Sequence, residues 1–307
     1  MKRPTLLMMV LLAVVSGLAA QETKSPVYYH NPDWSPDGRS LVFESTREGR
    51  SAIYTIGLDG AGLRRLTDPA VTSGQPRWSR DGKKIVFYAE IDGRMQIFLM
   101  KKDGSGRRRI TDSPTLDYLP DISPTDDAVV FQSRSERAAV AHDIFVIRTD
   151  GTGRIRLTDG KSGYTATKWS PDGKKIVFVT MIVPKKYYRE MNRDELRQMK
   201  SSEEIVVMEK DGSRTVRLTD NDASDSNPQW SRNGKMIYYM SDRDGSPGVY
   251  AMNGNGTGQR KITGSIVPNP FVSPDEKNIA YTKEVDGKRG LYIYGIKSGT
   301  ERLLIGN

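Results

Sequence analysis

Short apolar runs rich in β-branched and aromatic residues recur along the chain at near-regular intervals. The clearest set comprises runs that end in Phe or Tyr: Leu41–Phe43, Ile85–Phe87, Val129–Phe131, Ile176–Phe178, Ile237–Tyr239 and Ile279–Tyr281. A second apolar run follows in each copy, and Asp-Gly usually closes it, as at Asp59-Gly60 and Asp103-Gly104. Because glycine accepts the positive φ of a tight hairpin turn, this pattern predicts successive antiparallel strands.

These runs belong to a longer repeat with four expected strands. Each copy contains an anchor serine in a segment such as Trp34–Gly38, and the six serines are Ser35, Ser79, Ser123, Ser170, Ser231 and Ser273. Their spacings are 44, 44, 47, 61 and 42 residues, and most copies end in Leu-Thr-Asp or a close variant. Four antiparallel strands per repeat at this period are typical of a propeller blade. The sequence therefore predicts an all-β, six-bladed β-propeller of four-stranded antiparallel blades.

The Trp-Ser-Pro-Asp-Gly, Ile-Tyr and Leu-Thr-Asp elements, in this order, resemble the TolB-like propeller family over about residues 28–307. The resemblance implies a periplasmic propeller that works by protein contact, as TolB does in the Tol-Pal envelope complex. TolB has a separate α/β domain before its propeller, whereas the first repeat here follows closely on residue 20, so we expect a stand-alone relative. The sixth repeat ends with an outer strand at 302–305. We therefore expect packing between the first and last blades, rather than a shared strand, to close the ring.

The first twenty residues have the pattern of a secretory signal peptide. Lys2 and Arg3 precede an apolar run, and small residues follow at 16–20. We expect residues 1–20 to be removed and residues 21–307 to form one propeller domain, secreted and most plausibly periplasmic. The apolar run is too short to span a bilayer, so we expect no membrane-spanning segment. The chain contains no Cys, which excludes disulfides and lipid-modified cysteine.

The charge balance changes this picture little. The formal net charge of +9 falls to +7 without Lys2 and Arg3, which is a modest excess for this length. It permits an anionic partner, and secretion argues against nucleic acid as the partner.

Candidate catalytic chemistry is sparse. The chain lacks the Gly-x-Ser-x-Gly elbow of hydrolases, and its two histidines, His30 and His142, stand in no motif with metal-ligand spacing. The segment Asp242–Gly245 resembles the start of a calcium loop, but the downstream glutamate is missing, so we expect a turn with solvated charges. We therefore expect no enzymatic activity, no catalytic residue, no cofactor and no metal site.

The innermost strand of each blade borders the central channel in a propeller, so the residues just before each anchor serine are candidates for its lining. Two positions before the serines stand Asp33, Arg77, Asp121, Lys168, Gln229 and Phe271. The first four alternate in sign between neighbouring blades. We expect Asp33, Arg77, Asp121 and Lys168 to form an internal ring of ion pairs rather than a metal site.

A set of amides lies two residues earlier on the same side of these strands: Asn31, Gln75, Asn227 and Asn269. Two interpretations are open: these amides receive a polar ligand or partner backbone, or they satisfy the loops around the channel entrance. Together with His30 they form one part of a candidate partner-binding face.

The other part is an insertion in the fourth repeat, at about 182–202, which accounts for the 61-residue spacing. Asn192 and Glu195 form an Asn-x-x-Glu capping box, which predicts a short helix at 193–200. Aromatic and basic residues precede it: Lys185, Lys186, Tyr187, Tyr188 and Arg189. This composition is typical of a recognition surface. Alternatively, the helix covers a neighbouring blade.

The leading hypothesis is a non-catalytic scaffold in the cell envelope that binds a protein partner through this face. The alternative is a carbohydrate-binding propeller or a relative of oligosaccharide lyases, with a small glycan as ligand, and a third possibility is a sensor of a small ligand. A sugar site should show stacked aromatic rings over a polar pocket, whereas a protein site should be broad and ringed by protruding loops.

Overall fold

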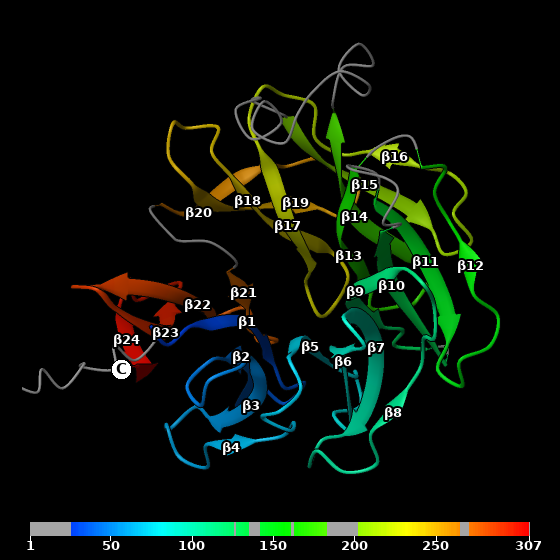
Figure 1. Cartoon of the computed structure of the whole chain (residues 1–307). Helices are drawn as coiled ribbons and strands as arrows, with labels where there is room; N and C mark the ends of the chain where they lie inside the picture. The colour runs from blue at the N-terminus through cyan, green and yellow to red at the C-terminus, as the bar shows by residue number, and fades with distance from the viewer. Residues whose placement is uncertain are drawn as a thin grey trace, which may run out of the picture.

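The computed structural model of the chain describes residues 26–125, 127–134, 142–160, 163–182, 202–264 and 270–306. These residues form twenty-four strands in six separate four-stranded sheets, arranged as blades around a central axis (Figure 1). Each sheet contains four strands that are consecutive in sequence and antiparallel. The prediction of a six-bladed β-propeller is therefore confirmed. The expected signal peptide at 1–20 and the expected helix at 193–200 lie outside the described residues.

The first three blades contain twelve strands. Blade 1 consists of β1 (Tyr29–Trp34), β2 (Ser40–Ser45), β3 (Ala52–Gly57) and β4 (Arg64–Arg65). Blade 2 consists of β5 (Ser73–Trp78), β6 (Lys84–Ile91), β7 (Arg94–Lys101) and β8 (Arg108–Arg109). Blade 3 consists of β9 (Leu116–Ile122), β10 (Ala128–Arg134), β11 (His142–Arg148) and β12 (Ile155–Arg156).

The other three blades repeat this order. Blade 4 consists of β13 (Gly163–Trp169), β14 (Lys175–Ile182), β15 (Ser202–Glu209) and β16 (Val216–Arg217). Blade 5 consists of β17 (Asp225–Trp230), β18 (Met236–Ser241), β19 (Gly248–Asn253) and β20 (Arg260–Gly264). Blade 6 consists of β21 (Phe271–Val272), β22 (Asn278–Val285), β23 (Lys288–Gly295) and β24 (Glu301–Gly306). The first strand of each blade is innermost, and the described residues include no helix that could cross a membrane.

The core consists of six layers, each lying between two neighbouring blades. In β2, Val42 packs towards blade 2, while Leu41 and Phe43 pack towards blade 6. Successive residues of a strand face opposite sides of the sheet, so a strand between two blades is buried on both faces. This explains why the second strands contain continuous apolar runs rather than an alternating pattern.

Turn chemistry accounts for the repeated motifs. In blade 1 the Ser35 hydroxyl donates to the Asp37 carboxylate at 2.6 Å and accepts the Ser40 N–H at 3.0 Å, and Gly38 has a φ of 70°. In the Leu-Thr-Asp motif, the Thr67 hydroxyl accepts the Ile53 N–H at 2.9 Å. The same bond recurs in blades 2, 3 and 4. These motifs therefore stabilise the blades.

Packing between blades 1 and 6 closes the ring. One apolar cluster contains Trp34 and Leu41 of blade 1 together with Leu291 and Ile293 of blade 6. The Trp34 indole N–H also donates to the Phe271 carbonyl at 2.7 Å. No described strand is shared between these two sheets, as the sequence led us to expect.

The innermost strands contain bulges with an unusual backbone. In five blades a non-glycine residue there has a φ between 48° and 55°: Asn31, Gln75, Leu119, Ala166 and Asn227. The register of the pairing shifts at each of these positions. The bulge turns the backbone N–H towards the neighbouring blade, as at Gln75, where Glu44 accepts it at 2.7 Å. This left-handed conformation is costly for a residue with a Cβ atom.

We therefore expect Ala166→Gly to stabilise the propeller, although glycine normally weakens a strand. A left-handed alanine costs roughly 1–2 kcal/mol, and the added freedom of glycine in the unfolded chain removes about 0.5–1 kcal/mol of this gain. Urea unfolding should show a net increase in the free energy of unfolding of up to about 1 kcal/mol. The control is Ala251→Gly, at a fully buried position in β19 outside the left-handed region. This control should have a lower free energy of unfolding than wild type. An equal loss in Ala166→Gly would show that the backbone at Ala166 is not strained.

Candidate binding site in the central channel

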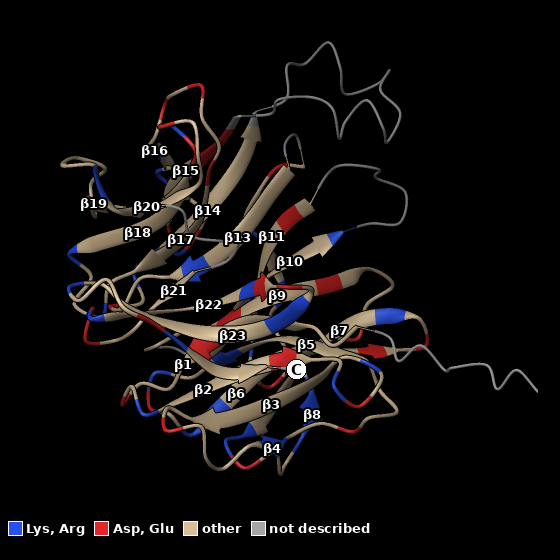
Figure 2. Ribbon diagram, turned by 90° about the vertical axis from the view of Figure 1, so that its left-hand side faces the viewer, with Lys and Arg blue, Asp and Glu red and all other residues tan. Residues whose placement is uncertain are grey.

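A cavity of about 190 Å³ lies at one end of the channel, where the turns between first and second strands meet. We call it the mouth cavity. Its lining includes the four tryptophans Trp34, Trp78, Trp169 and Trp230, the prolines Pro36, Pro124, Pro171 and Pro274, and the side chains of Arg80, Arg232, Tyr238 and Glu276. In Figure 2 these turns lie on the left of the molecule, and the links between second and third strands lie on the right.

The floor of the mouth cavity is formed by the residues two positions before the anchor serines: Asp33, Arg77, Asp121, Lys168, Gln229 and Phe271. Each lies on an innermost strand, after the bulge where that strand has one, so that all six side chains meet at the same level of the channel. The structure thus places all four residues of the expected charge ring in one site.

The acceptors among these residues hold neighbouring blades together. Asp33 Oδ2 accepts the Trp78 backbone N–H of the next blade at 2.8 Å. Asp121 makes the same bond to the Trp169 N–H, also at 2.8 Å. In blade 5 a neutral amide replaces the carboxylate: Gln229 accepts the Val272 N–H at 2.9 Å and donates to the Val272 carbonyl at 3.0 Å. The alternation of charge along the chain gave no sign of these hydrogen bonds.

The two cations behave differently from each other. Lys168 Nζ lies 3.8 Å from Asp121 Oδ1, within ion-pair distance. Arg77, only 5% exposed, donates instead to the Pro76 carbonyl at 2.7 Å, and its guanidinium lies 4.6 Å from the centre of the Phe271 ring. Within the described part of the chain, no ion pair of 4.0 Å or less joins Arg77 to Asp33. The structure therefore forms one ion pair of the expected ring and not the other.

Burial determines the protonation behaviour of this floor. It raises the pKa of Asp33 above its usual value, and the Arg77 charge opposes the shift. Burial likewise raises the pKa of Asp121, opposed mainly by Lys168. Burial, with a further contribution from Arg77, lowers the pKa of Lys168 to about 8. These shifts follow from removing charged groups from water, which the internal pairing offsets only in part.

Three of the candidate amides, Asn31, Gln75 and Asn227, lie in the first half of their innermost strands, outside the mouth cavity. Gln75 Oε1 accepts the Leu119 N–H of the next blade at 2.7 Å, so this oxygen has a structural partner. Asn227 Nδ2 lies 3.7 Å from the Met240 sulfur. His30 is exposed and stacks on Tyr28 with ring centres 5.7 Å apart. Asn269 and the group Lys185, Lys186, Tyr187, Tyr188 and Arg189 lie outside the described residues.

Glu44, which lies beside the amides, was not among the candidates from the sequence. Its carboxylate accepts the Gln75 N–H at 2.7 Å, and burial raises its pKa. The available signal was a charged residue directly after the apolar run Leu41–Phe43, within the second strand of its blade. His142, in contrast, bonds through Nδ1 to the Tyr118 hydroxyl at 2.6 Å, and burial lowers its pKa. Within the described ranges no three His, Asp or Glu side chains gather as a metal site would require.

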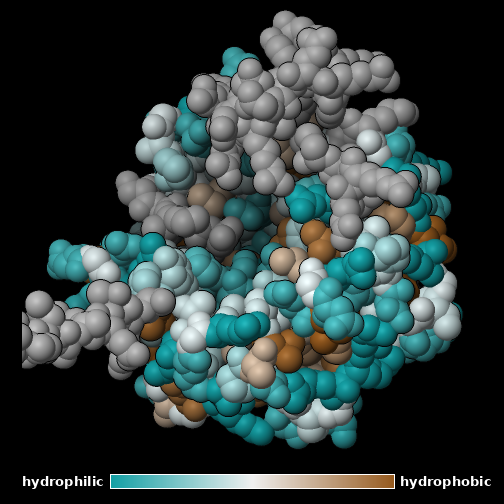
Figure 3. Space-filling model, in the orientation of Figure 1, coloured by the Kyte–Doolittle hydropathy of each residue, from teal (hydrophilic) through white to brown (hydrophobic). Residues whose placement is uncertain are grey.

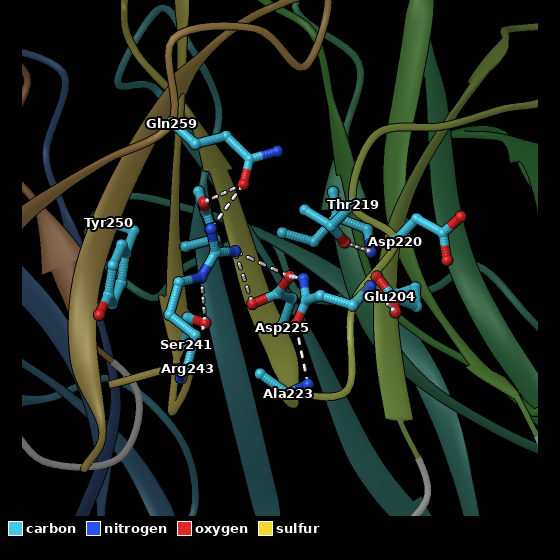
Figure 4. A network of polar contacts seen from close by, with 12 residues as sticks. Glu204, Thr219, Asp220, Ala223, Asp225, Ser241, Arg243, Tyr250 and Gln259 are labelled. Atoms are coloured by element: carbon cyan, nitrogen blue, oxygen red, sulfur yellow. Dashed lines mark hydrogen bonds and ion pairs between the residues drawn. The ribbon is translucent and has the colours of Figure 1, made fainter. Parts of the chain in front are cut away.

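The Asp242–Gly245 segment forms the expected turn, in which Asp244 is exposed to solvent as expected, whereas Arg243 is half-buried. Arg243 binds both oxygens of the fully buried Asp225 at 3.1 and 3.0 Å (Figure 4). Its guanidinium also lies 5.0 Å from the centre of the Tyr250 ring. The Asp244 carboxylate accepts the Tyr250 hydroxyl at 2.6 Å. These carboxylates therefore belong to a network that connects the strands of blade 5.

Comparison with known proteins identifies relatives of this ring. A family model described as the TolB beta propeller domain matches residues 7–143 and 195–306. The Tol-Pal system protein TolB of Syntrophus aciditrophicus is 40% identical over 47 residues, which are 15% of this chain and 10% of that protein. Dipeptidyl-peptidase 5 of Porphyromonas gingivalis is 29% identical over 129 residues, 41% of this chain and 17% of that protein. The aligned segments thus span less than a fifth of either relative.

Solved structures share the fold. A putative TolB from Agrobacterium tumefaciens superposes with a TM-score of 0.65 at 22% identity, covering 84% of this chain and 90% of that chain. TolB from Acinetobacter baumannii gives 0.67 at 19% identity, covering 90% and 62%. An oligogalacturonate lyase in complex with manganese gives 0.63 at 14% identity, covering 90% and 78%. At these identities the likeness concerns the fold alone.

The first test of the site concerns the hydrogen bond of Asp33. We expect Asp33→Ala to lower the free energy of unfolding by about 1–3 kcal/mol, because the Trp78 N–H loses its acceptor. Asp33→Asn keeps an acceptor oxygen at this position, as Gln229 does in blade 5. Its free energy of unfolding should therefore fall clearly less than that of Asp33→Ala. Urea unfolding of both variants measures the difference. Equal losses would show that the charge of Asp33, rather than its hydrogen bond, stabilises the ring.

The second test uses the pKa of Lys168. Because this pKa is about 8 in the folded chain against an ordinary value of 10.5, the folded state binds fewer protons between these two pH values. The contribution of Lys168 to stability must then rise as pH increases through this window. One pKa unit corresponds to about 1.4 kcal/mol. As pH rises through this window, the free energy of unfolding of wild type should therefore increase by on the order of 3 kcal/mol relative to that of Lys168→Met. The control is Lys174→Met, which replaces an exposed lysine. If the difference in free energy of unfolding between wild type and Lys168→Met did not change with pH, the lowered pKa of Lys168 would be refuted.

Proposed function

Because the chain belongs to the TolB β-propeller domain family, we propose that it is a non-catalytic binding scaffold of the cell envelope that recognises a protein partner. The proposal includes export to the periplasm, on the strength of the signal-peptide pattern at 1–20 and of the relatives named TolB. Some proteins with this fold are enzymes, among them the lyase and the peptidase named above. The chemistry of the channel is therefore the feature that favours a scaffold.

The observation that carries the proposal is that the two carboxylates and the lysine of the channel floor already have internal partners. Asp33 and Asp121 accept backbone N–H groups of the next blade, and Lys168 pairs with Asp121. A general acid or base must exchange its proton with a substrate within hydrogen-bond reach. Carboxylates whose loss would separate the blades are poorly suited to that task.

The tryptophans argue against the glycan-binding alternative. Trp34 and Trp169 are nearly buried and belong to the apolar layers between blades. A sugar ring needs an open aromatic face on which to stack, and these two faces are already covered by neighbouring strands. The mouth cavity is also small for an oligosaccharide.

We place the protein contact on the face opposite the mouth cavity, which Figure 3 shows. Hydrophilic residues dominate the part of this face that the figure colours, and they surround a hollow near the centre of the ring. The innermost strands begin on this face, and their first halves contain His30, Asn31, Gln75 and Asn227. The link between β14 and β15 departs from the same face. Aromatic and basic residues in that link, such as Tyr187 and Arg189, have the composition of interface hot spots.

The chain itself supplies the design for a test of this surface. In blade 2 the pair Ile91 and Arg94 is joined by Asp92-Gly93, and both of these residues have positive φ, as a type I′ hairpin requires. Asp286-Gly287 closes blade 6 in the same way. The last pair of β14 and β15 is Ile182 with Ser202. Replacing residues 183–201 by Asp-Gly should therefore give a hairpin of the same kind.

We expect the shortened protein to remain a folded propeller and to lose most of its partner binding. Thermal unfolding reports on the fold, and crosslinked pull-down from envelope extract reports on binding. Residues 183–201 carry six basic and three acidic side chains, and the inserted Asp adds one negative charge, so the control variant should lower the net charge by four elsewhere. Four exposed lysines changed together to serine do so on the opposite face: Lys83, Lys174, Lys235 and Lys277.

Four outcomes are informative. Retained capture by the control and loss by the shortened protein support the proposal. Equal capture by both rejects this surface as the contact site. If wild type captures no protein partner at all, the scaffold function itself is rejected. Unfolding of the shortened protein would favour the interpretation of the insertion as a cover over a neighbouring blade.

A further inference from the structure

The repeat is broken at two opposite blades on the turn face. The residue after the anchor serine is proline in blades 1, 3, 4 and 6: Pro36, Pro124, Pro171 and Pro274. In blades 2 and 5 it is arginine, Arg80 and Arg232. Proline at such a turn position reduces the conformational entropy of the unfolded chain. Where the native backbone suits proline, this stabilises the folded protein by about 0.4–1 kcal/mol. The two arginines therefore stand where proline would stabilise the turn.

These two arginines meet across the mouth cavity. Arg80 donates to the Arg232 carbonyl at 3.5 Å, and Arg232 donates to the Pro36 carbonyl of blade 1. Both residues are exposed, and in the described part of the chain neither forms an ion pair with a carboxylate. Two guanidinium groups from opposite blades thus converge on one opening, with donor groups left for an incoming acceptor.

Further donors lie unused in the wall of the same cavity. The indole nitrogens of Trp78, Trp169 and Trp230 are buried and have no hydrogen-bond partner, and the same holds for Nε of Arg77. Trp169 is only 7% exposed. Buried donors without partners are uncommon in native proteins. Trp34, the fourth tryptophan of the lining, is bonded to the Phe271 carbonyl.

The charge of the lining favours an anion with a single charge. Four basic and three acidic side chains line the mouth cavity. The carboxylates of Asp33 and Asp121 remain bound to backbone N–H groups, and Glu276 accepts the Tyr238 hydroxyl at 2.6 Å. One positive charge is therefore in excess. A dianion such as phosphate carries two negative charges, of which the surplus positive charge balances only one. The three carboxylates of the lining would repel the other.

A second hollow of about 550 Å³ adjoins the mouth cavity between blades 4 and 5, and we call it the turn groove. It shares Arg80, Trp230 and Arg232 with the mouth cavity. The rest of its lining contains a proline and two glycines together with polar and charged side chains, among them Asp172, Lys175 and Asn233. The groove thus offers hydrogen-bonding groups to the uncharged part of a ligand whose charged end lies in the mouth.

We propose that the mouth cavity binds the carboxylate group of a small organic monocarboxylate between Arg80 and Arg232, with the polar remainder of the ligand in the turn groove. Planar guanidinium groups match the two oxygens of a carboxylate. This site lies at the opposite end of the channel from the proposed protein contact and does not depend on it.

The chain offers a direct readout, because it contains four tryptophans and all four line the mouth cavity. Uniformly ¹⁵N-labelled full-length protein should show four indole N–H signals, which Trp→Phe variants assign. Glucuronate and an acetylated dipeptide with a free carboxylate are the two probes, and glucose and the amidated dipeptide are their neutral counterparts. We expect saturable shifts of the Trp78 and Trp230 signals with an acid and none with its neutral counterpart. Trp34, whose N–H is already bonded, should shift least.

Variants then test the two arginines. Arg80→Gln and Arg232→Gln should each weaken binding of the acid roughly tenfold or more, since each removes a charge-assisted hydrogen bond. Both residues are exposed, so the thermal unfolding midpoint should stay near that of wild type. Arg39→Gln, an exposed arginine of the blade 1 turn that does not line the mouth cavity, should bind as wild type does.

The relative affinity of the two acids distinguishes a sugar acid from a peptide terminus as the source of the carboxylate. The proposal is overturned if neither acid gives a saturable shift, or if both arginine variants bind as tightly as wild type. Binding of inorganic phosphate as tight as that of either acid would overturn the choice of a monocarboxylate.

Discussion

Each blade of this propeller buries its second strand on both faces, and it can do so only between two neighbours. Val42 needs blade 2, while Leu41 and Phe43 need blade 6. A single blade would leave both of these faces in water, at a cost of roughly 25 cal/mol per Å² of apolar surface. Ring closure is therefore a condition of stability for every blade. Because no described strand is shared between blades 1 and 6, this closure rests on the apolar layer around Trp34 and on hydrogen bonds such as those of Trp34 and Arg302.

The channel serves the same requirement. The bulges turn backbone N–H groups of one blade towards the next, and an acceptor side chain meets each of the N–H groups of Gln75, Trp78 and Trp169. Gln229 performs this task without a charge, so a carboxylate is not required for it. Where Asp33 and Asp121 stand, cations must accompany them into the channel. The charge ring is then a consequence of how the blades are joined, and this leaves recognition to the two ends of the channel.

Sequence periodicity predicted the fold because each motif acts within its own blade. The turn from Ser35 to Ser40 and the hydrogen bond from the Ile53 N–H to the Thr67 hydroxyl repeat wherever the motif repeats. Contacts between blades were less accessible. Asp33, for example, binds a backbone N–H of the next blade. Nearly every residue has such an N–H, so the side chain at the partner position gives no sign of this contact. Likewise, alternating charges suggested two ion pairs, but Arg77 found carbonyl groups and the Phe271 ring instead.

Departures from the repeat are the more informative positions for function, since every other position has a structural reason that holds in all blades. A turn that contains Pro36 in one blade and Arg80 in the next has the same backbone role in both. The difference therefore concerns what the side chain meets beyond the turn. Arg80 and Arg232 stand three blades apart and reach towards one opening. Random loss of proline would not place two unpaired cations over a cavity lined by indole donors without partners. The insertion between β14 and β15 is the corresponding departure on the other face. In a repeat protein, function is accordingly best sought where the chain abandons its own pattern at a cost in stability.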